Sequence, residues 1–150
     1  MNYKIMNSKE VKQIKKLILE QWGAEIDLAT FAVLKNNRDK IFLISRHLEK
    51  VDYDELRINN LGLYLGTVEK GELRLSIEGS QLIGPKAQKN VVELPMDQIR
   101  LWFRGEDIMV NHDSSSFVIL KHDRDFLGSG KIAQGKLHNY IPKARRVELV

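Results

Sequence analysis

The spacing of hydrophobic residues predicts an amphipathic helix near the start of the chain. Between Val11 and Trp22 the apolar residues recur at the 3.6-residue spacing of one helix face, and lysines lie off that face. Asn7 and Glu10 have the types and spacing of a capping box, which would begin the helix. Gly23 is suited to end it. We interpret the lysines as a solvated helix face rather than as a binding surface.

A β-hairpin is predicted next. Residues 30–34 and 41–45 have strand-like composition, and the polar residues 36–39 between them favour a turn. The second strand is apolar on both faces, so we expect it in the middle of its sheet. A short helix is expected over residues 47–51. Near residues 59–62 the chain changes to a pattern of strands and turns, which indicates a domain boundary between residues 60 and 61.

Beyond this boundary the hydrophobic pattern has the two-residue period of β-strands. Residues 63–68 and 72–77 predict a second hairpin, in which Leu73, Leu75 and Ile77 share one face. Shorter predicted elements follow: strands at 90–94, 117–120, 127–132 and 137–141, and helical turns at 80–83 and 96–101.

The order of these elements predicts an α+β fold. The chain has 150 residues, enough for two small domains packed together. We expect a small α/β domain over residues 1–60. Many short strands with glycine-bearing turns then favour a mixed β-barrel over residues 61–150.

The basic residues are concentrated near the end of the chain. Residues 126–147 contain five Lys or Arg and no Asp or Glu, and without those five the chain total of 24 Lys and Arg would fall below the 20 Asp and Glu. Such a segment favours a phosphate-rich partner. A solvated basic tail is the alternative, although the apolar residues of the segment favour a folded element.

Three roles are assigned to side chains and backbone in this basic segment. Cationic side chains would contact phosphates, polar ones would donate hydrogen bonds, and glycines would let the backbone approach the partner closely. Asn139 could instead hold a turn before Pro142, and Gly130 could mark a bulge. The candidate residues are Lys131, Lys136, Lys143, Arg145 and Arg146 for phosphates, His138 and Asn139 for hydrogen bonds, and Gly128 and Gly130 for backbone approach.

No motif of a catalytic, metal or cofactor site is found. The chain has no cysteine, which excludes disulfides, thiolate metal sites and a cysteine nucleophile. Its four histidines lack metal-ligand spacing. Residues 112–114 read His-Asp-Ser, but neighbours in a loop do not reach triad geometry, so we interpret them as a polar turn. Residues 128–130 lack the third glycine of a dinucleotide fingerprint.

The expected location is the cytoplasm. No run of about eighteen apolar residues could span a membrane. The first residues also lack the apolar core of a signal peptide.

Two groups of RNA-binding proteins resemble this chain. The order of elements is similar to that of the Nip-type factors of large-subunit ribosome biogenesis, in which a small α/β domain precedes a PUA domain. Residues 62–66 and 73–77 carry this weak resemblance. Residues 102–108 and the basic segment resemble the C-terminal RNA-binding portion of the Sun-family RNA cytosine-C5 methyltransferases. The matching positions are Leu127, Gly128, Gly130, Lys131, Gly135, Leu137, Asn139, Pro142, Lys143 and Arg146.

These resemblances imply a PUA-type protein that binds ribosomal RNA or transfer RNA without being an enzyme. Methyltransferases of the Sun family attack cytosine with a cysteine, which this chain lacks. It also lacks a glycine-rich motif for S-adenosylmethionine. The alternative is an accessory subunit that presents RNA to a separate RNA-modifying enzyme or sits among ribosome-assembly factors. An enzyme of unrecognised type is the third hypothesis.

Overall fold

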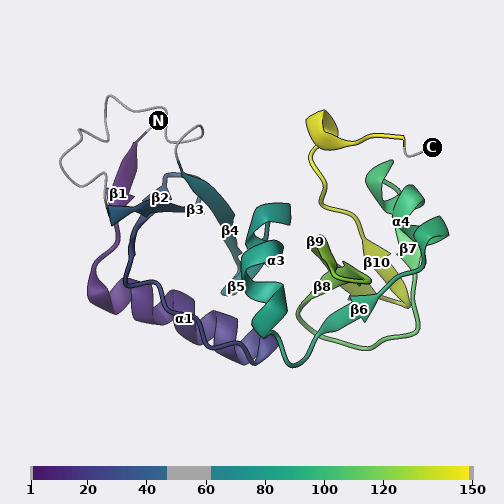
Figure 1. Ribbon diagram of the computed structural model, residues 1–150, viewed down its shortest axis with the longest axis horizontal. Coiled ribbons are helices and arrows are strands. Elements are labelled where there is room, and N and C mark those ends of the chain that lie inside the picture. Colours follow the sequence, from purple (N-terminus) through teal and green to yellow (C-terminus); the bar gives the residue numbers. More distant parts are fainter. Residues whose placement is uncertain (1, 47–61, 149–150) are drawn as a thin grey trace.

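The computed structural model describes residues 2–46 and 62–148, whose strands form two five-stranded sheets. Figure 1 shows α1 along the first sheet, α3 between the sheets and α4 beside the second sheet. The elements of the first half are β1 Tyr3–Ile5, α1 Ser8–Trp22, β2 Phe31–Asn36, β3 Lys40–Ser45, β4 Leu63–Glu69, β5 Glu72–Leu75 and α3 Ile77–Ile83. Those of the second half are η2 Gly84–Lys86, β6 Val91–Glu93, α4 Met96–Phe103, β7 Ile108–Met109, β8 Phe117–His122, β9 Asp125–Ala133, β10 Lys136–His138 and η3 Lys143–Arg145.

The predicted first helix is confirmed together with both of its ends. The Asn7 side chain accepts from the Glu10 N–H at 2.9 Å, and the Glu10 carboxylate accepts from the Asn7 N–H at 3.1 Å. The latter bond holds the pKa of Glu10 below its ordinary value. Gly23 ends α1 with φ +65°, a left-handed conformation that glycine adopts without a steric penalty.

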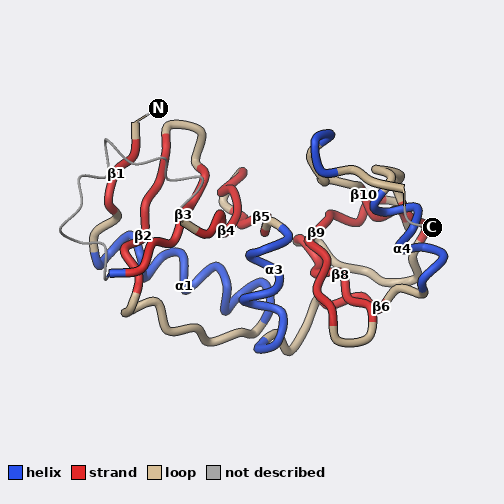
Figure 2. The backbone as a smooth tube through the Cα atoms, turned by 45° about the horizontal axis from the view of Figure 1, so that its top comes forward, coloured by secondary structure: helices blue, strands red, loops and turns tan. Residues whose placement is uncertain are grey.

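The first sheet has the strand order β1-β2-β3-β4-β5, with antiparallel neighbours throughout. The predicted hairpin corresponds to β2 and β3, and β3 is the central strand as expected. Figure 2 shows α1 running alongside these strands. The three-residue strand β1 was not predicted from the sequence. The helix expected over residues 47–51 lies outside the described residues.

The strand predicted over residues 72–77 is too long. Strand β5 ends at Leu75, because the Ser76 side chain accepts a hydrogen bond from the Gly79 N–H at 2.9 Å and so begins α3. Ile77 therefore lies in a helix rather than on a strand face. Helix α3 also packs closely on β4, since a Cβ added at Gly79 would lie 2.0 Å from the Leu65 carbonyl oxygen.

The second sheet is mixed, with the order β6-β8-β9-β10-β7. Strands β6 and β8 are parallel, and the other pairs are antiparallel. The strands predicted over 90–94, 117–120, 127–132 and 137–141 correspond to β6, β8, β9 and β10, although β10 ends at His138. The combination of helices with two sheets confirms the predicted α+β class.

The two sheets divide between β5, which ends at Leu75, and β6, which begins at Val91. Strands β4 and β5 thus belong to the first sheet by pairing. The predicted boundary between residues 60 and 61 lies at the edge of residues 47–61, which are not described, and it stays a prediction. The halves share a core, since the buried cluster beneath the first sheet includes Phe117 and Ile119 of β8.

The last turn of α1 joins the two halves through buried hydrogen bonds. The Gln21 side-chain amide donates to the Leu73 carbonyl at 2.9 Å, and its oxygen accepts from the Leu73 N–H at 2.8 Å. One residue on, Trp22 Nε1 donates to the Phe117 carbonyl at 3.1 Å. Helix α1 therefore binds β5 of the first sheet and β8 of the second.

We predict that Gln21→Ala lowers the free energy of unfolding by about 2–4 kcal/mol, since it leaves the N–H and C=O of Leu73 buried without partners. Gln21 is 6% exposed and Leu73 is fully buried. Urea unfolding followed by circular dichroism measures the change. Gln13→Ala, at an exposed site of the same helix, is the matched control and should change stability little. Equal effects of the two substitutions would contradict the role given to Gln21.

Candidate nucleic-acid interface

Lys131 is half-buried in β9 rather than free for a ligand. Its ammonium group forms an ion pair with Glu72 of β5 and lies 5.1 Å from the centre of the Phe117 ring. The structure therefore places this predicted phosphate contact inside the junction between the sheets, where it already has a carboxylate partner.

Two more of the predicted residues also face carboxylates. Arg145 Nη1 lies 2.7 Å from Glu78 Oε1 of α3, and His138 Nδ1 lies 3.3 Å from Asp107 Oδ2. The Arg145 and Glu78 side chains are 45% and 37% exposed, so water screens their attraction. These contacts place Arg145 beside α3 and His138 beside Asp107.

Asn139 joins the last turn of α4 to the loops around it. Its side-chain nitrogen donates to the carbonyls of Trp102 at 2.7 Å and Glu106 at 2.9 Å, and its oxygen accepts from the Ile141 N–H at 2.8 Å. The alternative role as a turn residue therefore has direct geometric support. Contact between this amide and RNA stays a prediction, and it would have to compete with three internal hydrogen bonds.

Lys136, Lys143 and Arg146 are exposed at the C-terminal end of the fold. Among the described residues, Lys136 and Lys143 have no ion-pair partner. Arg146 donates to the Ile141 carbonyl at 3.2 Å and packs over Gly105, where an added Cβ would meet it at 2.4 Å. The two lysines are therefore the predicted cations most available to an incoming phosphate.

The two predicted glycines serve internal packing. A Cβ at Gly130 would lie 2.6 Å from the His138 carbonyl oxygen and 3.0 Å from the Trp102 ring. Gly128 has φ +106°, and its N–H donates to Ser80 Oγ at 2.8 Å. Close approach of the backbone to RNA at these positions stays a prediction.

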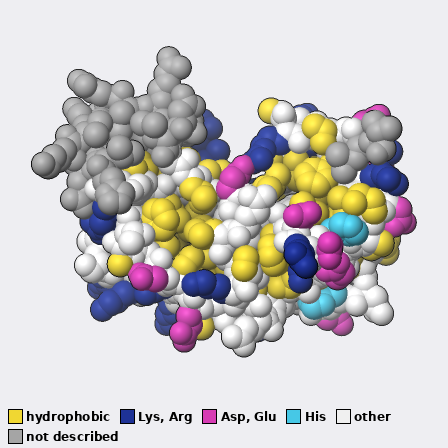
Figure 3. Space-filling model, viewed as in Figure 1, with side chains coloured by type: hydrophobic (Ala, Val, Ile, Leu, Met, Phe, Trp, Pro, Cys, Tyr) yellow, Lys and Arg dark blue, Asp and Glu magenta, His cyan; other side chains and the backbone are white. Residues whose placement is uncertain are grey.

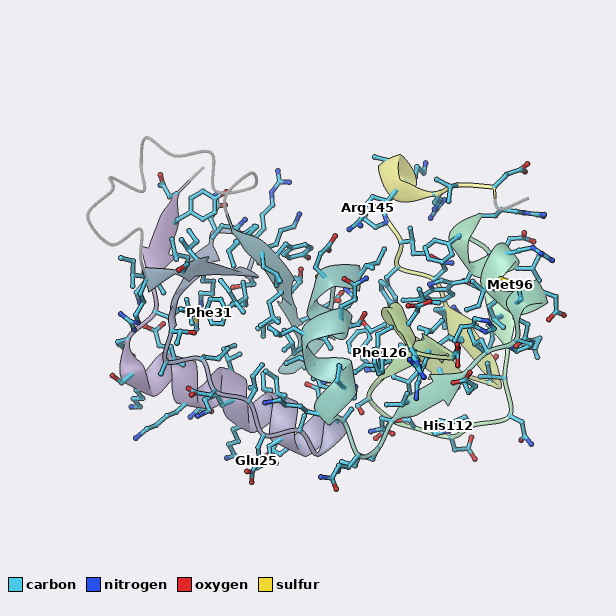
Figure 4. All side chains as sticks on the ribbon, viewed as in Figure 1. Glu25, Phe31, Met96, His112, Phe126 and Arg145 are labelled. Atoms are coloured by element: carbon cyan, nitrogen blue, oxygen red, sulfur yellow. The ribbon has the colours of Figure 1, made fainter. Side chains whose placement is uncertain are left out.

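A pocket opens between the first sheet and the C-terminal segment. It has a volume of about 110 Å³, and its lining includes Tyr64, Arg74, Gly128, Tyr140 and Arg145. Figure 3 shows the hollow between the two halves on the molecular surface. In Figure 4 the labelled Arg145 lies on the C-terminal segment, on the side that faces the first half. Both halves therefore contribute to one concave, partly aromatic surface.

The pocket residues of the first half were missed by sequence reasoning, and Arg74 and Tyr64 are those with side chains suited to a nucleic acid. Arg74 lies on β5, with its guanidinium carbon 4.7 Å from the centre of the Tyr140 ring and its Nε 3.1 Å from Glu69. Tyr64 lies on β4. The only signal was the alternation of β5, which places Arg74 on the face opposite the buried Leu73. No local pattern links that face to Tyr140.

The described parts of the chain give no geometric sign of a metal site or of a membrane helix. No group of three or more His, Cys, Asp or Glu side chains within them could hold a metal ion. None of the helices found there has the length and apolar character needed to cross a bilayer. In the predicted polar turn, Ser114 Oγ is hydrogen-bonded to Ser116.

Comparison with known proteins bears on the second half of the chain. Residues 89–147 match a family model described as the PUA domain of methyltransferase RsmF. The match is to a PUA domain. The matched residues run from before β6 to beyond η3 and include every residue of the predicted site, and the match confirms the resemblance to the C-terminal portion of the Sun-family enzymes. The resemblance to Nip-type factors stays a prediction.

Curated relatives extend the similarity to most of the chain. Ribosomal RNA small subunit methyltransferase F of Vibrio vulnificus is 24% identical over 137 residues, which are 91% of this chain. The proteins of that name from Vibrio parahaemolyticus and Aeromonas hydrophila are 23% and 28% identical over 91% and 79% of this chain. The chain spans 26–29% of the length of these relatives.

We predict that Asn139→Ala destabilises the protein by about 1–3 kcal/mol, because it removes three hydrogen bonds and leaves the N–H of the buried Ile141 without its partner. Thermal unfolding of the purified variant measures the effect. Asn111→Ala is the matched control, since Asn111 is exposed and its amide makes no hydrogen bond with the described residues. Unchanged stability of Asn139→Ala would show that this side chain is not a structural one.

Proposed function

We propose that this protein binds RNA through its PUA-type half and has no methyltransferase activity of its own. The match of residues 89–147 to the PUA domain of methyltransferase RsmF carries the proposal. The names of the curated relatives favour ribosomal RNA of the small subunit as the ligand, within RNA modification or ribosome biogenesis. Transfer RNA is the alternative ligand, and its affinity should be compared with that of ribosomal RNA.

Exposed cations support this function. Lys136 and Lys143 lie in the matched segment without carboxylate partners among the described residues, so a phosphate would not have to displace one. Arg145 and Arg146 lie next to Lys143 and extend the basic surface. Each neutralised phosphate releases counterions, which makes such binding sensitive to salt.

The second candidate function is an accessory subunit that presents RNA to a separate methyltransferase. The curated relatives are methyltransferases by name, and this chain spans about 28% of the length of the Vibrio vulnificus protein. The chain has no cysteine that could add to a pyrimidine ring. Copurification with an RNA-modifying enzyme would favour this function over independent RNA binding.

We predict that Lys136→Ala with Lys143→Ala weakens binding to small-subunit ribosomal RNA roughly tenfold, since each substitution removes a cation that neutralises a phosphate. The slope of log K against log salt should also become shallower by about 1.4, because each phosphate on single-stranded RNA that is no longer neutralised accounts for about 0.7. Filter binding at several salt concentrations measures both quantities.

The matched control is Lys12→Ala with Lys15→Ala, which removes the same charge from exposed lysines of α1. If the PUA-type half is the site, the control pair should reduce affinity much less than the C-terminal pair. Equal reductions would show that net charge alone attracts RNA, and a larger reduction from the control would place the site in the first half.

We predict that the purified protein transfers no methyl group to ribosomal RNA, because the chain contains no thiolate to attack the ring. Incorporation of label from methyl-labelled S-adenosylmethionine tests this, with a complete methyltransferase of the Sun family as the positive control. Methylation by the pure protein would refute the non-enzymatic function while leaving RNA binding intact.

A further inference from the structure

The pocket between the two halves has the size of a single planar ring. Its volume of about 110 Å³ is close to that of an engineered apolar protein cavity of roughly 150 Å³, which takes benzene. A pyrimidine base has one ring, whereas a purine has two fused rings. The volume therefore favours a pyrimidine over a purine.

The pocket also offers the surfaces on which unpaired bases stack. Arg74 lies on the Tyr140 ring at 4.7 Å, and Tyr140 meets Phe117 edge-on with ring centres 5.6 Å apart. RNA-binding proteins stack splayed-out bases on aromatic rings and on guanidinium planes. Because Tyr140 packs against Phe117, it offers the Arg74 guanidinium a well-ordered ring to lie on.

The polar atoms deeper in the lining are already satisfied. Ser129 Oγ donates to the Leu75 carbonyl at 2.8 Å, and Ser76 Oγ accepts from the Gly79 N–H at 2.9 Å. These groups leave few free donors or acceptors in the pocket for the edge of a base. Recognition would therefore depend on ring size and stacking rather than on the pattern of donors and acceptors.

Two arginines beside the pocket can meet the charge of the attached phosphate. Arg74 and Arg145 are paired with Glu69 and Glu78, and all four side chains are between 26% and 45% exposed. Ion pairs exposed to this degree are weak, so a phosphate can replace a carboxylate at little cost. A nucleotide would thus present its ring to Arg74 and its phosphate to Arg145.

We propose that this pocket holds one unstacked pyrimidine nucleotide of the bound RNA, with its base on Arg74 and its phosphate at Arg145. The inference rests on the proposed RNA binding and makes it more specific. Because Arg74 and Tyr64 precede residues 89–147, the first half would take part in recognition together with the PUA-type half.

The test compares RNA hairpins that are identical except for one bulged position, which carries uridine, adenosine or an abasic sugar. The wild-type protein should bind the uridine hairpin on the order of tenfold more tightly than the abasic one, as stacking of one base would give. The adenosine hairpin should bind like the abasic one, because a purine is too large.

Arg74→Lys tests the stacking surface, since it keeps the positive charge but removes the planar guanidinium. It should lower the affinity for the uridine hairpin to that for the abasic hairpin and so abolish the preference for uridine. Arg124→Lys, at an exposed site in the turn between β8 and β9, is the matched control and should keep the preference. Circular dichroism confirms that both variants are folded.

Each outcome decides between the hypotheses. Equal wild-type affinity for uridine and abasic hairpins would overturn the pocket and leave RNA binding in place, and this result needs no variant. A preference that survives Arg74→Lys, or that extends equally to adenosine, would overturn the assignment of a single ring on Arg74. Failure to bind any of the hairpins would reject both the pocket and the proposed function.

Discussion

The hydrogen bonds at the end of α1 set how the two halves of the protein sit together. In the described sheet, β5 is an edge strand in which Leu73 is fully buried, and buried backbone groups must be paired. The Gln21 amide pairs with both polar groups of Leu73 and so replaces part of a neighbouring strand. Because Trp22 binds β8 at the same time, the position of Arg74 relative to Tyr140 depends on this one helix turn.

Carboxylates of the first half neutralise part of the charge that distinguishes the second half. Lys131 and Arg145 belong to the basic segment, yet Glu72 and Glu78 of the first half lie against them. The cations therefore differ in how readily they can bind a phosphate. Lys136 and Lys143 can attract phosphate directly, whereas Arg145 has to exchange one anion for another. This division separates general attraction of RNA from the more specific contact that we infer at the pocket.

Most local elements could be predicted because their causes lie within a few residues of each other. The capping box of α1 and its final Gly23 involve neighbours along one helix, and both predictions are confirmed. The prediction of a strand over residues 72–77 was wrong at its C-terminal end, and the cause was equally local. Alternation of Leu73, Leu75 and Ile77 favoured a strand, but the hydrogen bond accepted by Ser76 began a helix there instead. Strands β1 and β7 are too short to give a periodic signal.

The sequence by itself determined the order of the longer elements, the α+β class and the concentration of positive charge near the end of the chain. The tertiary structure decided which of those charges are free, and it gave Asn139 its internal hydrogen bonds with Trp102 and Glu106. It also decided that Arg74 meets Tyr140. The physical reason is how far apart in the sequence the interacting residues lie. Periodicity and capping act between residues close in sequence, whereas ion pairs and stacking join residues that only the packing of two sheets brings together.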